Sequence, residues 1–236
     1  RYVITHSPDE RGINVALLYQ RGIFKLLSNR SYPVMKPRRN SHPTRDILHV
    51  SGQLLNSDTL DVFVVHFPSR SGGAKASEPY RLAAAQRLKD TTDSLLRIRT
   101  RPQIIIMGDF NDYPDNKSIQ KILKAGIPPT ETDSLDSRML YHLLARKGID
   151  NKHFGSYKYQ GEWRLLDHII LSGSLLMPGS PLYTAEEKAG VFRAPFLLTE
   201  DRKYGDEQPF RTYYGMKYQG GYSDHLPVWA EFRLLY

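Results

Sequence analysis

Short apolar runs alternate with turn residues through the first third of the chain. Runs of about four to eight apolar, β-branched and aromatic residues between polar turns favour extended structure. Four such runs occupy residues 13–19, 24–27, 47–55 and 60–67. Turn-forming residues at 20–22 and 56–58 separate the members of each pair. The pattern therefore predicts two β-hairpins.

The pattern changes to a helical one in the next segment. Residues 79–99 carry leucine and alanine at near-helical spacing, with Pro79 at an early position where a helix tolerates it. This segment lies between the run that ends near His66 and a second apolar run at 104–107. We therefore predict a long helix that connects two strands.

The strand and helix order continues with weaker signals. Residues 119–123 and 139–145 are interpreted as shorter helices, and residues 163–171 as a strand. Residues 172–219 mix Gly, Pro and Tyr with charges of both signs, which indicates a long irregular insertion near the active face. We expect one domain over residues 1–236, with an α+β fold in which two sheets form a β-sandwich and helices lie outside.

The amino-acid composition limits the kinds of site and partner that the chain can have. The chain has 236 residues and no cysteine, which excludes disulfides, thiolate zinc sites and a cysteine nucleophile. Lys and Arg outnumber Asp and Glu by 33 to 25, for a net charge of +8. Such a balance favours polyanionic partners, nucleic acid among them, although simple solubility explains it equally well. The sequence contains no apolar run of transmembrane length; it predicts no compartment, and we expect a monomer.

Two acidic motifs stand at the ends of strand-like runs. Asp109 and Asn111 follow the run 104–107 two positions apart, so both side chains would emerge on the same side of an extended segment. Asp224 and His225 precede another apolar run near the end of the chain. Carboxylate and amide oxygens are the ligands that hard divalent cations prefer, and a held histidine serves hydrolysis by water. An Asx turn or a surface turn is the structural alternative for each motif.

Four segments in order resemble the endonuclease/exonuclease/phosphatase superfamily of metal-dependent phosphoesterases, the group of the DNase I-like nucleases. These segments are VVHFPSR at 64–70, MGDFN at 107–111, WRLLDHIIL at 163–171 and SDH at 223–225. The resemblance spans most of the chain. It implies a DNase I-like sandwich and hydrolysis of a phosphodiester or phosphomonoester.

The resemblance also implies roles for individual residues. Asp109 corresponds to the catalytic and metal-associated aspartate, and Asn111 to the asparagine that binds the transition state. His225 corresponds to the histidine that contacts the phosphate and the attacking water, with Asp167 fixing its tautomer. His66 corresponds to a histidine that donates to a phosphate oxygen or to the leaving group. Whether Asp109 or His225 removes the proton from water is left open.

We expect a divalent cation, Mg²⁺ or Mn²⁺, as the cofactor. Its expected ligands are Asp109, Asn111, Asp224 and His225. Arg70 and Arg81 are further candidates for contacting the substrate phosphate, because a guanidinium binds phosphate with two parallel hydrogen bonds. A solvated loop is the alternative interpretation for both arginines.

The opening of the chain departs from the superfamily pattern. Residues 7–19 resemble the segment just after the metal-binding glutamate of that family, so the chain looks like a member without its first block. On that basis we expect weak divalent-metal binding by residues 1–236. A nuclease-like substrate is favoured by the basic charge, and residues 38–43 form a basic loop that could contact a nucleic acid backbone. A lipid or sugar-phosphate phosphoesterase and a catalytically weak binding module are the alternatives.

Overall fold

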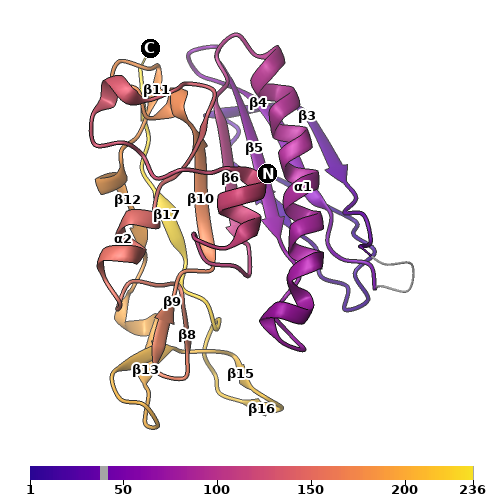
Figure 1. Ribbon diagram of the computed structural model, residues 1–236, viewed down its shortest axis with the longest axis vertical. Helices are drawn as coiled ribbons and strands as arrows, with labels where there is room; N and C mark the ends of the chain where they lie inside the picture. Colours follow the sequence, from indigo (N-terminus) through magenta and orange to yellow (C-terminus); the bar gives the residue numbers. More distant parts are fainter. Residues whose placement is uncertain (38–41, 236) are drawn as a thin grey trace.

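A six-stranded mixed sheet forms the centre of the molecule (Figure 1). The computed structural model describes residues 1–37 and 42–235, so most of the basic loop 38–43 lies outside the described residues. The strand order is β3-β4-β5-β6-β10-β7, and β5 and β6 run parallel while the other neighbours are antiparallel. The bounds of these strands are β3 Phe24–Tyr32, β4 Ile47–Leu54, β5 Thr59–His66, β6 Ile104–Asp109, β10 Asp167–Ser172 and β7 Leu140–His142.

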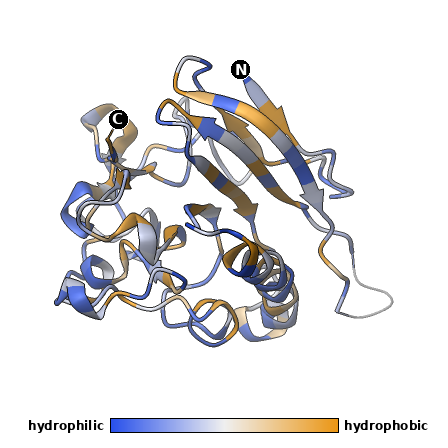
Figure 2. Cartoon of the chain, turned by 90° about the horizontal axis from the view of Figure 1, so that it is seen from above, coloured by the Kyte–Doolittle hydropathy of each residue, from blue (hydrophilic) through white to orange (hydrophobic). Residues whose placement is uncertain are grey.

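Helix α1 (Ala74–Ile98) connects the parallel strands β5 and β6 and lies on one face of the sheet (Figure 2). Parallel neighbours need such a crossover, whereas antiparallel ones can be joined by a tight turn. The helix begins before the predicted start, so Pro79 lies inside it. Its buried face, which includes Ala85 and Leu88, packs with Phe63 and Ile106 of the sheet. The predicted short helix 119–123 is confirmed as the π-helix η1 (Ser118–Leu123), which adds to the same core.

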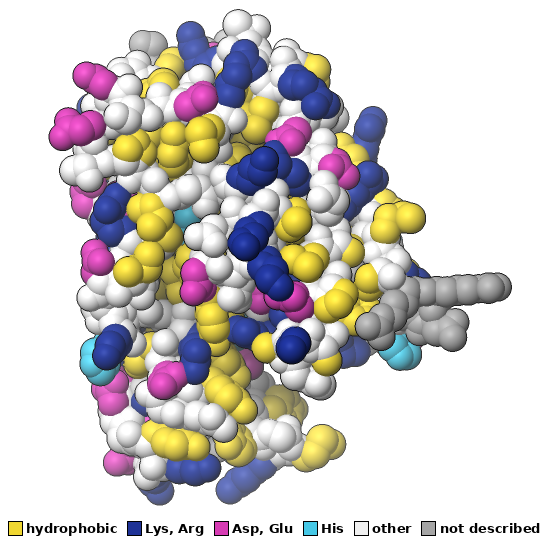
Figure 3. All heavy atoms as spheres, in the orientation of Figure 1, with side chains coloured by type: hydrophobic (Ala, Val, Ile, Leu, Met, Phe, Trp, Pro, Cys, Tyr) yellow, Lys and Arg dark blue, Asp and Glu magenta, His cyan; other side chains and the backbone are white. Residues whose placement is uncertain are grey.

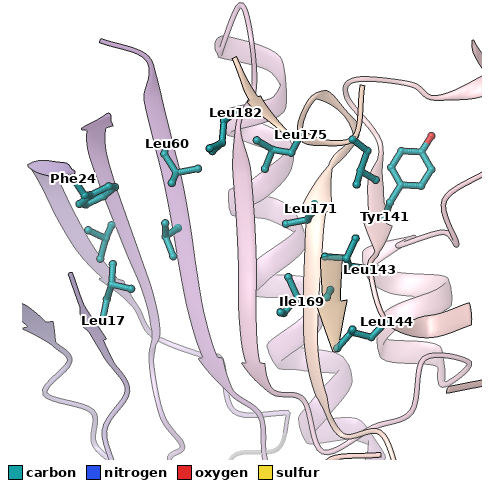
Figure 4. Close-up of a cluster of buried hydrophobic side chains, with 14 of the residues drawn as sticks. Leu17, Phe24, Leu60, Tyr141, Leu143, Leu144, Ile169, Leu171, Leu175 and Leu182 are labelled. Atoms are coloured by element: carbon teal, nitrogen blue, oxygen red, sulfur yellow. The ribbon is translucent and has the colours of Figure 1, made fainter. Parts of the chain in front are cut away.

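A second core lies between the other face of the sheet and several short ladders (Figure 4). Phe24, Leu60 and Leu171 of the sheet pack there with Leu17 and Leu182 of the ladders. The ladders are β1 (Tyr2–Ile4) with β2 (Ala16–Leu18), β11 (Leu182–Tyr183) with β18 (Arg233–Leu234), and β12 (Ala189–Val191) with β17 (Val228–Ala230). The predicted α+β sandwich is thereby confirmed.

The segment 172–219 is more regular than the sequence predicts. Strands β11 and β12 belong to the second layer, because they pair with strands at the end of the chain. The rest of the segment forms two hairpin-like ladders. These are β13 (Leu198–Glu200) with β14 (Glu207–Pro209), and β15 (Tyr213–Tyr214) with β16 (Lys217–Tyr218).

Three local predictions need correction. The first predicted hairpin does not form, because β2 pairs with β1 while β3 pairs with β4. The predicted helix 139–145 is the edge strand β7 followed by α2 (Ala145–Asp150), because pairing with β10 satisfies the backbone of this short buried run. The predicted strand 163–171 is two strands, β9 (Glu162–Arg164) and β10, and β9 pairs with β8 (Tyr157–Tyr159). No helix in the described ranges is long and apolar enough to cross a membrane.

Candidate active site

Three polar residues lie side by side at one end of the central strands. In the register of the sheet, His66 on β5 faces Asp109 on β6, and Asp109 faces Asp167 on β10. The side chains belong to neighbouring strands about 4.8 Å apart, so they project close together at this edge. The Nε2 atom of His66 lies 3.6 Å from Oδ2 of Asp109. Three of the four sequence motifs therefore meet at one edge of the sheet.

The loop after β6 holds Asp109 in a fixed position. Gly108 has a φ of 138°, and a Cβ there would lie 1.9 Å from the carbonyl oxygen of Val65, so this position requires glycine. Asn111 adopts a left-handed φ of 50°, which asparagine tolerates better than most residues. Its backbone N–H donates to Oδ1 of Asp109 at 2.7 Å, and its Nδ2 donates to Oδ2 at 2.9 Å and to the carbonyl oxygen of Phe67 at 3.0 Å. Both amide hydrogens are used in these bonds, so Asn111 has its carbonyl oxygen to offer a ligand.

His225 reaches the same edge from the end of the chain. The backbone N–H of Leu226 donates to the carbonyl oxygen of Ser156, which anchors the segment beside β8. The Nδ1 atom of His225 lies 2.6 Å from Oδ2 of Asp167. Ser156 Oγ donates to the same carboxylate oxygen at 2.5 Å. A carboxylate on Nδ1 fixes the tautomer of an imidazole and leaves Nε2 for other partners.

The charges at this edge perturb one another. Burial, reinforced by the charge of Asp167, raises the pKa of Asp109 to about 7. Burial alone would lower the pKa of His225, but the hydrogen bond and charge of Asp167 outweigh it and raise that pKa to about 9. Burial and the charge of Arg45 lower the pKa of His66 to about 4, so this imidazole is neutral at pH 7. The edge thus combines two carboxylates, an imidazolium and a neutral imidazole.

Asp109, Asp167 and His225 could hold a metal ion. One ligand atom from each of the three lies within 4.8 Å of the others. Burial chiefly, and the charge of Asp167 next, raise the pKa of Asp109, and a cation at this position would offset both effects. Asp224, which the sequence also suggests as a ligand, is exposed and lies outside this group.

The two arginines predicted to contact the substrate phosphate lie in different environments. Arg81 is 1% exposed, and its Nε lies 2.7 Å from Oδ1 of Asp112. Its Nη1 donates to Ser77 Oγ within α1. The buried guanidinium of Arg81 thus packs against protein groups and is not exposed to a substrate phosphate. Arg70 is half-buried, and its guanidinium lies 4.4 Å from the ring centre of Tyr113 beside the Asn111 loop.

The structure adds three residues that the sequence reasoning missed. Arg45 is buried and donates to the carbonyl oxygens of His66 and Phe67 while pairing with Asp9 at 3.0 Å, so it fixes the end of β5. Ser156 supports Asp167, as described above. The ring of Tyr157 lies 4.8 Å from that of His225. Their contacts join segments far apart in the chain, and nothing in the local sequence marks them.

Replacing Ser156 by alanine is expected to lower kcat of the full-length protein for its substrate roughly tenfold while changing KM little. The substitution removes one hydrogen bond to Asp167 without touching substrate; such a bond to a charged acceptor is worth about 1.5–3 kcal/mol, and a tenfold loss lies near the lower end. Steady-state kinetics test this expectation, with Ser156→Thr expected to restore part of kcat because a hydroxyl is retained. A purely structural role would instead lower stability and leave kcat of the folded protein unchanged.

Comparisons with known proteins identify the family and the fold of the chain. The model of the Endonuclease/Exonuclease/phosphatase family matches residues 1–233. The fold is similar to that of a mannosyl-6-phosphatase from Bacteroides thetaiotaomicron, with 16% identity, a TM-score of 0.60, and coverage of 99% of this chain and 77% of the other.

Two further solved structures share the fold. The human Nocturnin catalytic domain with bound sulfate has 16% identity, a TM-score of 0.59, and coverage of 99% and 72%. TDP2 from D. rerio complexed with a single-strand DNA product has 13% identity, a TM-score of 0.57, and coverage of 98% and 77%. No curated protein matches the sequence.

Proposed function

The chain belongs to the endonuclease/exonuclease/phosphatase family, and from this premise we propose that it is a divalent-metal-dependent phosphoesterase whose reaction takes place at the Asp109, Asp167 and His225 edge of the sheet. The observation that carries the proposal is the register of three adjacent strands. It places His66, Asp109 and Asp167 in one row, and His225 is bonded to the last of them.

The donor set suits a hard cation. Asp109 and Asp167 would hold Mg²⁺ or Mn²⁺ through carboxylate oxygens, with His225 as a third ligand once it has lost its proton. The carbonyl oxygen of Asn111 is a hard ligand like the carboxylates. When bound, such a cation neutralises charge on the phosphate and promotes ionisation of water. The side chains of the two aspartates already crowd negative charge at this position, which favours cation binding.

The protein groups divide the remaining tasks. Proton removal from the attacking water falls to Asp109 or His225, whose pKa values of about 7 and about 9 are both affected by the charge of Asp167. The bond from Asp167 to Nδ1 orients the His225 ring and leaves Nε2 to face the cation or the attacking water. His66 is neutral, so it can donate one hydrogen bond to a phosphate oxygen without adding charge. Because Asn111 already donates both amide hydrogens, a donor role toward the phosphate would require release of one of these bonds.

The substrate we favour is a phosphodiester of the nucleic acid type. The net charge of +8 favours a polyanion. Among the similar structures, D. rerio TDP2 is described with a single-strand DNA product, and the Bacteroides thetaiotaomicron protein as a mannosyl-6-phosphatase. A sugar-phosphate or lipid phosphoester is the second candidate, and the mannosyl-6-phosphatase supports the sugar phosphate.

Hydrolysis of two chromogenic esters by the full-length protein tests the proposal. We expect faster turnover of the diester bis-p-nitrophenyl phosphate than of the monoester p-nitrophenyl phosphate in the presence of Mg²⁺ or Mn²⁺. Preference for the monoester would favour the sugar-phosphate candidate. Absence of turnover of both esters, and of DNA, would contradict the proposal and favour a binding module with the same fold.

A further inference from the structure

An exposed aromatic hairpin lies at the same end of the molecule as the candidate active site (Figure 1). Its strands β15 and β16 present Tyr213, Tyr214 and Tyr218, which are 58%, 67% and 66% exposed. At the turn between them Met216 is 99% exposed. Isolated exposed apolar residues are ordinary, but a group this dense on one projecting element marks an interaction site.

The base of the hairpin is rigid. The backbone N–H of Gln219 donates to the carbonyl oxygen of Thr212, and that of Tyr222 to the carbonyl oxygen of Phe210. The Thr212 hydroxyl also donates to the carbonyl oxygen of Tyr222. These bonds tie the backbone of the hairpin together, and the rings of Tyr213 and Tyr218 pack edge to face with their centres 5.5 Å apart. Less ordering is then needed on binding a ligand, which lowers its entropy cost.

The hairpin is connected, through the chain and through aromatic contacts, to the strand ends that carry the candidate active site. Tyr222 at its base is three residues before His225 in the chain. The ring of Tyr157 contacts His225 and stacks on Tyr159 with an angle of 13° between the ring planes. The charge of Arg211 acts on the Tyr157 hydroxyl, and the guanidinium of Arg211 lies 5.5 Å from the ring centre of Tyr214. Aromatic rings and a cation thus extend from His225 to the hairpin.

The chemistry of this surface fits a chain of alternating aromatic rings and negative charges. Tyrosine faces stack on flat rings, and cations beside them neutralise phosphates. Figure 3 shows hydrophobic side chains with Lys and Arg beside them at this projecting end of the molecule. Lys217 lies within the hairpin itself, between the tyrosines. A lipid surface fits less well, because all the rings of the hairpin carry a hydroxyl and Met216 alone is fully apolar.

We propose that the β15 and β16 hairpin, together with Tyr157 and Tyr159, is a stacking platform for unpaired nucleobases next to the scissile phosphate. This inference rests on the proposed phosphodiester substrate and narrows it to single-stranded nucleic acid. Bases in a duplex are already stacked and paired, so their faces are closed to the tyrosines. The platform therefore selects single strands over duplexes.

Equilibrium binding of a short fluorescein-labelled oligothymidylate tests the platform, measured by anisotropy with full-length protein in EDTA so that no hydrolysis occurs. We expect the double variant Tyr214→Ala/Tyr218→Ala to bind on the order of tenfold more weakly, the size expected for loss of base stacking. The matched variant Tyr214→Phe/Tyr218→Phe keeps the rings and should bind like the wild type. Tyr2→Ala, which removes a 70% exposed tyrosine from the β1 and β2 ladder, is the control.

Two further ligands make the test independent of any folding defect in a variant. An abasic oligomer with the same phosphates, and a duplex of the same length, should each bind the wild type on the order of tenfold more weakly than the oligothymidylate. Equal affinity for the abasic and thymine oligomers, or for the wild type and the alanine variant, would overturn the platform. A further outcome would also overturn the platform: the wild type sediments with phosphatidylserine vesicles, oligothymidylate does not compete, and the alanine variant no longer sediments. That result would assign the hairpin to membrane binding.

Hydrolysis of bis-p-nitrophenyl phosphate by the wild type tests the proposed function separately. Absence of that hydrolysis contradicts the phosphoesterase proposal, while the EDTA binding comparison still decides the role of the hairpin. Normal hydrolysis together with equal binding of all oligomers contradicts the hairpin alone.

Discussion

Replacing His225 by alanine is expected to lower kcat/KM for phosphodiester hydrolysis by about 10²–10⁴-fold, the usual contribution of a positioned proton-transfer group. The imidazole is held by Asp167 at 2.6 Å and lies beside Asp109, so its removal leaves two carboxylates without their positive partner. Steady-state kinetics of the full-length protein measure the loss. Circular dichroism of the variant separates it from unfolding.

His153→Ala is the matched control for this variant, because His153 is exposed and belongs to none of the four motifs that form the candidate site. It should leave kcat/KM within about twofold of the wild type, as surface substitutions usually do. Asp167→Asn should also lower kcat/KM, because it removes both the carboxylate that orients His225 and a candidate metal ligand. An unaffected His225→Ala variant would remove the Asp167 and His225 pair from the mechanism.

Much of the central sheet could be predicted from the sequence. The run before Asp109 is continuous and apolar because β6 is covered on both faces, by α1 on one side and the second core on the other. The run 60–67 is apolar for the same reason. Such strands are visible in a sequence because burial acts on nearly every position. The confirmed fold follows from these runs together with the order of the motifs.

The short edge elements could not be predicted in the same way. Strand β7 has three residues, and its apolar residues fit a helix as well as a strand until pairing with β10 decides. Strand β9 joins β10 in one apolar run of the sequence, and the change of direction between them depends on pairing with β8. Runs this short carry too few residues for periodicity to distinguish the two structures.

In the candidate site, too, some residues could be predicted from the sequence and others could not. The motif residues lie at or near the ends of strands, so their convergence was predictable from the resemblance, and the structure brings Asp109, Asp167 and His225 together. The supporting residues Arg45 and Ser156 act through contacts across long sequence separations. Arg81 belongs to a buried ion pair with Asp112, which a helix pattern cannot reveal. Tertiary ion pairs leave no local pattern, so the structure is needed to find them.

Removal of divalent metal is the second large effect that we expect. Treatment of the full-length protein with EDTA should abolish hydrolysis of bis-p-nitrophenyl phosphate, and Mg²⁺ or Mn²⁺ should restore it. The physical reason is that the carboxylates of Asp109 and Asp167 crowd one position, where a cation offsets their repulsion and neutralises the phosphate. Asp109→Asn removes one of these charges and should require far more metal for the same rate. Asp115→Asn, an exposed substitution in the loop after β6, should respond like the wild type.

The most direct test of the central claim is a titration of EDTA-treated protein with Mg²⁺, followed in parallel by calorimetry and by diester hydrolysis. We predict that heat of binding and activity rise together in the wild type, and that both are shifted to much higher Mg²⁺ in Asp109→Asn. Hydrolysis that persists in EDTA, or a titration that Asp109→Asn leaves unchanged, would contradict a metal-dependent phosphoesterase site at Asp109, Asp167 and His225.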